Sequence, residues 1–103
     1  MSKLYVEEFP GAGRYQGSSV PVADTGVWTE NANSPMTVAA SATVSASFGT
    51  NTKLIRVHTD AICSIVISPT GANATANNAR MAANQTEYYY VEAGHYISVI
   101  TNS

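Results

Sequence analysis

The chain has 103 residues, a formal net charge of −2 and 45% hydrophobic residues, which predicts a single domain with one hydrophobic core. Charged residues make up only 12%, and the five basic residues are scattered instead of forming the cluster that nucleic-acid binding requires. No apolar run is long enough to span a membrane, and two acidic residues stand where a signal peptide would have its apolar stretch. We therefore expect a protein that is made in the cytoplasm of its host cell and binds neither nucleic acid nor membrane. Its weakly charged surface suits contact with other proteins.

The first forty residues contain short extended stretches separated by turn-forming residues. Lys3–Phe9 has the composition of a strand, and the Pro10–Gly13 stretch is typical of a turn, because it lacks the further glycine or lysine of a phosphate-binding loop. Proline excludes Val20–Val22 from a central strand. We expect residues 1–40 to form an extended arm or edge region, which crosses the core strands or reaches a neighbouring molecule. Residues 41–103 are then the core strands of the same single domain.

Three segments between residues 43 and 67 are predicted to be strands, because they are rich in β-branched residues and are separated by turn residues such as Gly49-Thr50-Asn51. Their spacing of about ten residues predicts an antiparallel meander. The three segments are Thr43–Phe48, Lys53–His58 and Ile62–Ile67.

Period-two alternation predicts which side chains of these strands share a face. In the first strand Val44, Ala46 and Phe48 point the same way, and in the second Ile55 and Val57 do so. In the third strand Cys63, Ile65 and Ile67 share a face, which predicts that the thiol is buried as a small hydrophobic group. A lone cysteine cannot form an internal disulfide, and this fits a reducing compartment.

The last thirty residues are predicted to form a loop and two further strands. Residues 72–79 are nearly all alanine and asparagine; because asparagine competes for backbone hydrogen bonds, we expect an exposed loop. Glu87–Val91 and His95–Ile100 follow, and the short Glu92–Gly94 connection predicts a hairpin. No segment has a 3.6-residue apolar stripe. The sequence therefore predicts an all-β fold, an antiparallel β-sandwich of the jelly-roll or immunoglobulin-like kind with an extended N-terminal arm.

Candidate catalytic and metal-binding groups lack the partners that such chemistry needs. His58 and Asp60 lie close together, but no nucleophile motif accompanies them. Cys63 with His58 and Asp60 lacks the paired ligand spacing of a zinc site. We expect Arg56, His58 and Asp60 to form a polar cluster that fixes a strand end. No pair of acidic residues is placed face to face by the sequence, as glycoside hydrolysis would require. The sequence thus predicts no enzyme, no cofactor and no metal ion.

Tyr88-Tyr89-Tyr90, followed by Tyr96, is the most unusual feature of the sequence. In a strand Tyr88 and Tyr90 point one way and Tyr89 the other, and tyrosine is enriched at protein interfaces. Three interpretations stay open: a protein interface, a core face with an ordinary surface face, and a platform for sugar stacking. The expected interface residues, with Trp28 as an anchor of the N-terminal arm, are Trp28, Tyr88, Tyr90, Tyr96, Val20 and Val22.

Three segments resemble a pattern in small virion proteins of tailed bacteriophages. They are Met1–Phe9, Thr52–Cys63 and Ala79–Gly94. The resemblance extends over nearly the full chain and is weakest between residues 11 and 37. The Ala/Asn-rich loop between Gly71 and Ala79 departs from the pattern.

The resemblance implies a capsid decoration or cement protein, often a jelly roll or related β-sandwich, that sits on the phage particle as a dimer or trimer. It brings no catalytic residues. We therefore expect a structural virion protein that binds the major capsid protein or other virion proteins and decorates or stabilises the particle. The alternative is a carbohydrate- or receptor-binding module of a phage particle, with the tyrosines and Trp28 as stacking groups.

Overall fold

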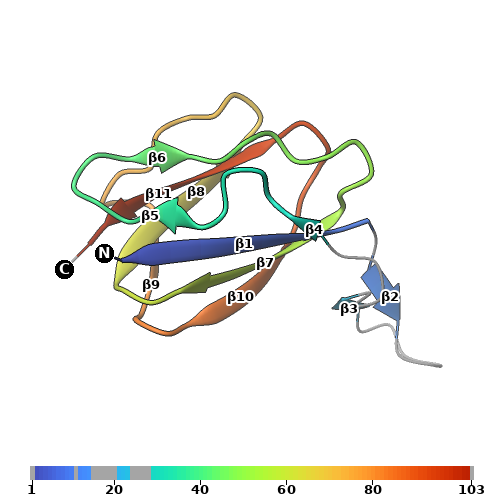
Figure 1. The fold of residues 1–103 in the computed structure, drawn as a ribbon, viewed down its shortest axis with the longest axis horizontal. Helices are drawn as coiled ribbons and strands as arrows, with labels where there is room; N and C mark the ends of the chain where they lie inside the picture. Colours follow the sequence, from blue (N-terminus) through green and yellow to red (C-terminus); the bar gives the residue numbers. More distant parts are fainter. Residues whose placement is uncertain (1, 11, 15–20, 24–28, 103) are drawn as a thin grey trace.

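The computed structural model describes residues 2–10, 12–14, 21–23 and 29–102. Within these ranges the chain is all-β, with no helix, and two antiparallel sheets pack face to face as a sandwich (Figure 1). The predicted antiparallel β-sandwich is confirmed. Because no helix is present in the described ranges, none could be long and apolar enough to cross a membrane.

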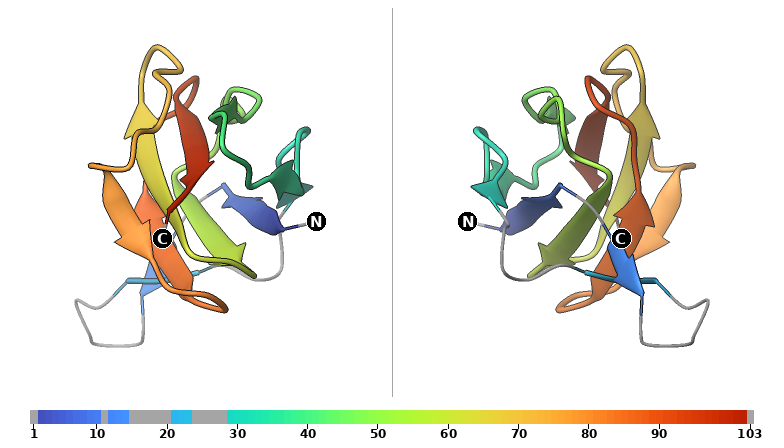
Figure 2. Two further views of the ribbon diagram at one scale, coloured as in Figure 1. Left: turned by 90° about the vertical axis from the view of Figure 1, so that its left-hand side faces the viewer. Right: turned by 90° about the vertical axis from the view of Figure 1, so that its right-hand side faces the viewer.

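The described strands fall into two main sheets and one separate pair. The five-stranded sheet has the order β10-β7-β1-β4, with β5 also paired to β1, and the four-stranded sheet has the order β6-β11-β8-β9. Strands β2 and β3 pair only with each other and lie beyond one end of the sandwich (Figures 1 and 2). The bounds are β1 Lys3–Phe9, β2 Ala12–Arg14, β3 Pro21–Ala23, β4 Thr29–Glu30, β5 Met36–Thr37, β6 Thr43–Val44, β7 Leu54–Thr59, β8 Cys63–Ser68, β9 Ala79–Met81, β10 Thr86–Tyr90 and β11 Tyr96–Thr101.

The order of the strands is that of a jelly roll in which one strand has changed its place in the sequence. A jelly roll has eight strands in two sheets; with the strands lettered B to I, the sheets run B-I-D-G and C-H-E-F. Strands β5 to β11 take the places of B to H in chain order, so the four-stranded sheet matches C-H-E-F in full. The place of the C-terminal strand I, between β5 and β7, is taken by β1. The strand order of the sandwich therefore corresponds to that of a jelly roll with one strand moved from the end of the chain to its start.

Both ends of the described chain lie toward the same end of the sandwich (Figure 1), but they are separated across its width (Figure 2). Two consecutive residues join them: the Val38 amide donates to the carbonyl of Ser2 at 3.0 Å, and the carbonyl of Ala39 accepts from the Thr101 amide at 2.9 Å. The start of β1 and the end of β11 thus lie on either side of Val38 and Ala39.

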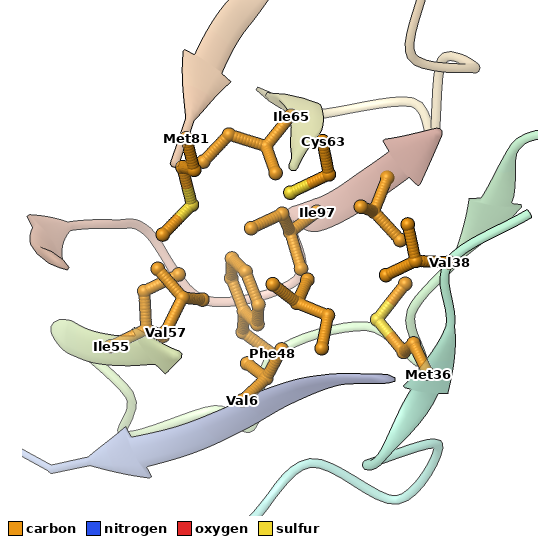
Figure 3. Packing of buried hydrophobic residues seen from close by; sticks show 12 residues of the cluster. Val6, Met36, Val38, Phe48, Ile55, Val57, Cys63, Ile65, Met81 and Ile97 are labelled. Atoms are coloured by element: carbon orange, nitrogen blue, oxygen red, sulfur yellow. The ribbon is translucent and has the colours of Figure 1, made fainter. Parts of the chain in front are cut away.

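The hydrophobic core fills the space between the two sheets (Figure 3). β1 and β7 supply alternate residues from one sheet, and β8, β9 and β11 supply them from the other, as the two-residue period of a strand dictates. Ile55 and Val57 share the inner face, as predicted, and Cys63 is fully buried with Ile65, while Ile67 packs against them half-buried. The buried cluster consists of Leu4, Val6, Met36, Val38, Phe48, Ile55, Val57, Cys63, Ile65, Met81, Ile97 and Val99.

The predicted meander and the predicted C-terminal hairpin are both wrong. β7 pairs with β1 and β10 and lies in the five-stranded sheet, whereas β6 and β8 both pair with β11 in the other sheet. β10 and β11 also lie in different sheets, so the Glu92–Gly94 connection crosses the sandwich and does not close a hairpin. Its turn has a hydrogen bond from the His95 amide to the Glu92 carbonyl, with Gly94 at φ 81°, a conformation that favours glycine. A short turn therefore serves a sheet-to-sheet crossing as well as a hairpin.

The predicted strand Thr43–Phe48 is shorter than its alternating pattern indicates. Only Thr43–Val44 forms a strand, and beyond it the buried side chains are Ser45 and Phe48, while Ala46 stays half-buried. Ser45 is inside because its hydroxyl accepts the Ile97 amide at 3.0 Å and donates to the Ala46 carbonyl at 2.8 Å. The first of these hydrogen bonds joins the segment to β11, and the second is a local bond of the kind that competes with a regular strand.

The expected division into an arm at residues 1–40 and core strands at 41–103 does not hold for β1 or β5. Leu4 and Val6 of β1 are fully buried, and β1 lies in the interior of the five-stranded sheet, with Met36 of β5 buried beside it. The strand is central because it pairs with β7 along its whole length and with β4 and β5 on its other side.

The predicted Ala/Asn-rich loop is mostly exposed, as expected, and a buried alanine fixes it to the four-stranded sheet. Ala74 is buried, and its amide donates to the Ser98 hydroxyl at 2.9 Å. Ser98 and Ser64 belong to the outer face of that sheet and are nevertheless buried, and Asn102 links the Ser64 hydroxyl to the carbonyl of Ala76. The loop therefore covers part of the outer face of the four-stranded sheet.

Candidate functional site

The outer face of the five-stranded sheet brings together side chains from three strands, and we call it the tyrosine face. The antiparallel registers place Tyr88 beside Arg56, Arg56 beside Glu7, and Tyr5 beside His58. These side chains point outward because they alternate with the buried residues of β1 and β7 and with half-buried Tyr89 of β10. The tyrosine face consists of Tyr5, Glu7, Arg56, His58, Tyr88 and Tyr90.

The tyrosine face carries all the large hydrophobic side chains that are exposed in the described part of the chain. Tyr5 is 41% exposed, Tyr88 53% and Tyr90 60%. Tyr89 points to the other side of β10, where it packs against the core, so the predicted alternation of the three tyrosines is confirmed. Burial raises the pKa of the Tyr89 hydroxyl, and the negative charge of Glu87 raises it further. Exposed aromatic rings that gather on one face are typical of a binding surface.

An ion pair lies among the exposed tyrosines. The Arg56 guanidinium donates from Nη1 to Oε1 of Glu7, which is its cross-strand neighbour. This hydrogen bond raises the pKa of Arg56, and the nearby charge of Glu7 adds to the rise against the opposing effect of burial. Arg56 and Glu7 keep 33% and 20% of their side chains exposed. The pair therefore holds two charged groups in fixed positions while leaving them open to contact.

A shallow hollow of about 190 Å³ lies on the same face. Its walls are Tyr5, Glu7, Glu30, Ser34, Arg56 and His58. The His58 ring is held by a hydrogen bond of 2.8 Å between Nδ1 and the Thr86 hydroxyl, so Nε2 is its other polar atom. The hollow thus combines an aromatic ring with carboxylate, guanidinium, hydroxyl and imidazole groups, a set that suits reversible binding of a polar molecule.

The structure brings together only two of the predicted interface residues. Tyr88 and Tyr90 stand on one face, whereas Tyr96 belongs to β11 in the other sheet, where it is half-buried near Gly71 and Val44. The backbone of Val22 lies in β3, and Val20 and Trp28 lie outside the described residues. Tyr96 therefore does not share a face with Tyr88 and Tyr90, because β10 and β11 lie in different sheets.

Sequence reasoning missed Tyr5, Glu7 and the hollow. The signal for Tyr5 is present, because Tyr5 and Glu7 alternate with the apolar residues Leu4 and Val6 in the predicted strand Lys3–Phe9. The cross-strand neighbours of Tyr5 and Glu7 could not be found in the same way, because the pairing of β1 with β7 joins residues about fifty positions apart.

The expected polar cluster of Arg56, His58 and Asp60 does not form. Arg56 pairs with Glu7, His58 with Thr86, and the Asp60 carboxylate accepts the backbone amide of Lys3 at 2.7 Å. Arg56 and His58 share a face of β7, but Asp60 lies beyond the end of that strand. The three groups thus have three separate partners, two of them in β1 and one in β10.

Cys63 lies in the core, away from these polar groups. It is fully buried, and desolvation raises the pKa of its thiol, partly offset by a hydrogen bond with the Thr59 hydroxyl. A buried thiol with a raised pKa is a poor nucleophile. Among the described residues no cluster of three or more histidine, cysteine or acidic side chains could hold a metal ion.

Comparisons with protein-family models, with curated proteins and with solved structures find no match for this chain.

Proposed function

We propose that the chain is a structural virion protein of a tailed phage, which binds the major capsid protein or another virion protein through its tyrosine face. The observation that carries this proposal is the gathering of Tyr5, Tyr88 and Tyr90 on one sheet face. The opposite outer face is partly covered by the chain's own loop at residues 71–78. The asymmetry between an open aromatic face and a covered face favours one-sided attachment to a larger surface.

The chemistry of the tyrosine face supports a protein partner. Tyrosine rings offer large contact areas at a small cost in side-chain entropy, and arginine is likewise enriched at interface hot spots. The fixed Arg56–Glu7 pair offers both charge signs to a partner. A jelly-roll sandwich and the resemblance to small virion proteins agree with this role.

Replacing Tyr88 and Tyr90 together with alanine is expected to leave the fold intact, because both rings are exposed. Loss of two aromatic contacts at a hot spot costs about 2–4 kcal/mol of binding free energy, so binding should weaken on the order of 30-fold or more. The measurement is the amount of each variant in purified particles of the phage that encodes the chain, by quantitative mass spectrometry.

Arg80→Ala is the matched control, because Arg80 is exposed on the four-stranded sheet. It should be present in particles at the wild-type level. Absence of the wild-type chain from purified particles would refute the virion role. Wild-type amounts of the double variant would instead refute the tyrosine face as the contact.

Carbohydrate binding is a second candidate function, and the hollow beside Tyr5 favours it. A sugar ring can stack on an aromatic ring while its hydroxyls bond to Glu7, Arg56 or His58 on the same wall. On this alternative the chain binds defined glycans on an array, and Tyr5→Ala abolishes that binding while Tyr88→Ala and Tyr90→Ala together do not. An array with no signal for the wild-type chain would exclude it.

A further inference from the structure

Strand β10 forms an edge of the five-stranded sheet (Figure 1), and among the described strands only β7 pairs with it. Hydrogen bonds to β7 run from the Thr59 amide to the Gln85 carbonyl and from the Val91 amide to the Lys53 carbonyl. In an antiparallel ladder every second residue bonds to the same neighbour. Residues 85, 87, 89 and 91 therefore face β7, and the backbone N–H and C=O groups of Thr86, Tyr88 and Tyr90 face outward.

The other edges of the two sheets in the described part of the chain are short or interrupted. β6 has two residues, β9 has three and includes Arg80, and the edge beside β1 is split between β4 and β5 by a turn with Pro35. Charged residues, proline and short length are the usual means of preventing edge-to-edge association. β10 has five residues, no lysine, arginine, proline or glycine, and two exposed tyrosines. It is the longest uninterrupted edge among them.

We propose that β10 pairs with β10 of a second copy of this chain, antiparallel and centred on Tyr88. In this register Tyr88 lies opposite Tyr88 of the second copy, and Thr86 lies opposite Tyr90. Every outward-facing N–H and C=O group of Thr86, Tyr88 and Tyr90 then finds a partner.

Charge and hydrogen bonding select this register over its neighbours. Centring the pair on Glu87 would place two carboxylates opposite each other, which is unfavourable in a sheet. Centring it on Tyr89 would leave the outward groups of Thr86 without a partner from β10. In the Tyr88 register Glu87 lies opposite Tyr89, so no like charges meet. The strand is thus complementary to itself.

Pairing in this way joins the two five-stranded sheets into one continuous sheet. The two tyrosine faces then lie on the same side, with the Tyr88 rings of both copies adjacent at the two-fold axis. The dimer thus has twice the exposed aromatic surface of one subunit, and neither subunit changes its structure. The dimer goes beyond the proposed function, since it requires no virion partner and can be tested on the purified chain.

Tyr88→Cys tests the register directly. Residues opposite each other in a hydrogen-bonded pair have Cα atoms about 5.5 Å apart, which is within the range for a disulfide. Under mild oxidation this variant should become a covalent dimer on non-reducing gels. Tyr90→Cys is the matched control: its thiol lies opposite Thr86, so it should remain largely uncrosslinked. The native Cys63 should not interfere, because it is buried.

Tyr88→Pro tests the backbone contact. Proline removes the outward N–H and is tolerated on the free side of an edge strand, so this variant should be a folded monomer by circular dichroism and light scattering. Tyr88→Ala, which keeps the N–H, should remain a dimer at high concentration. A wild-type chain that is monomeric at every concentration, or Tyr90→Cys that crosslinks as well as Tyr88→Cys, would overturn the proposal. The role in the particle would be unaffected by either result.

Discussion

Removal of residues 2–10 is expected to leave the chain unfolded, with loss of the β-sheet signal in circular dichroism and of chemical-shift dispersion in NMR. The deletion removes a central strand, not an arm. It exposes the edge of β7 and takes Leu4 and Val6, both fully buried, out of the core. Two large-to-small core substitutions alone cost about 4 kcal/mol or more, and the lost ladder adds to this. We expect the combined loss to exceed the free energy of unfolding of a domain of this size, which is about 5–15 kcal/mol.

The strand order of the sandwich provides a sharper version of this experiment. Because Val38 and Ala39 bridge the start of β1 and the end of β11, the same residues can be attached after Ser103 through a glycine–serine linker long enough to cross this segment. The rearranged chain has the jelly-roll order, and we expect it to fold. The matched control carries Leu4→Asp and Val6→Asp in the attached strand and should stay unfolded. A folded chain after simple deletion of residues 2–10 would show that the segment is an accessory arm.

The sequence carried reliable information about which side of a strand each residue faces. Ile55 and Val57 are buried and Tyr88 and Tyr90 are exposed, as the two-residue period indicates. This works because the alternation is a local property of the backbone and the buried face must be apolar. The lack of a 3.6-residue apolar stripe and the short segments separated by turn residues were also enough to predict an all-β sandwich.

The pairing of strands was not predictable by the same means. A turn such as Glu92–Gly94 can connect neighbours in one sheet or cross to the other, and the residues of the turn are compatible with both. In a jelly roll most consecutive strands lie in opposite sheets, so the assumption that neighbours in sequence pair in space fails repeatedly. The misplacement of Tyr96 follows directly from this, and so does the failure to connect Arg56 with Glu7.

Buried polar residues are the other feature that the pattern could not reveal. From the sequence Glu8, like its neighbour Glu7, is expected to be a solvated acidic residue, yet its exposed fraction is only 6%. Glu8 is buried because the fold brings Asn31 and the loop at residues 46–52 to the end of β1, where they hydrogen-bond to its carboxylate. The partners lie 23 to 44 residues away in the sequence, so no local signal marks them.

Glu8→Ala is expected to lower the free energy of unfolding by about 3 kcal/mol, a large part of the stability of such a domain. The Glu8 carboxylate accepts from Asn31 Nδ2 at 2.7 Å, from the Gly49 amide at 2.9 Å and from the Thr52 hydroxyl at 2.7 Å. Alanine would leave these donors without their acceptor at a site from which water is largely excluded. Chemical denaturation followed by tryptophan fluorescence or circular dichroism measures the change.

Glu7→Ala is the natural control, because Glu7 is the next residue of the same strand and points to the opposite face. Its ion pair with Arg56 is partly exposed, and such pairs contribute about 0–1 kcal/mol. Two adjacent glutamates should therefore differ several-fold in their effect on stability. In a double-mutant cycle the effects of Glu8→Ala and Asn31→Ala on stability should be strongly non-additive, because the two side chains hydrogen-bond to each other. Asn31 Nδ2 also donates to the Ala46 carbonyl, so Asn31 links the loop at residues 46–52 to β1. Equal effects of Glu7→Ala and Glu8→Ala would mean that the carboxylate of Glu8 does not organise the end of the sandwich.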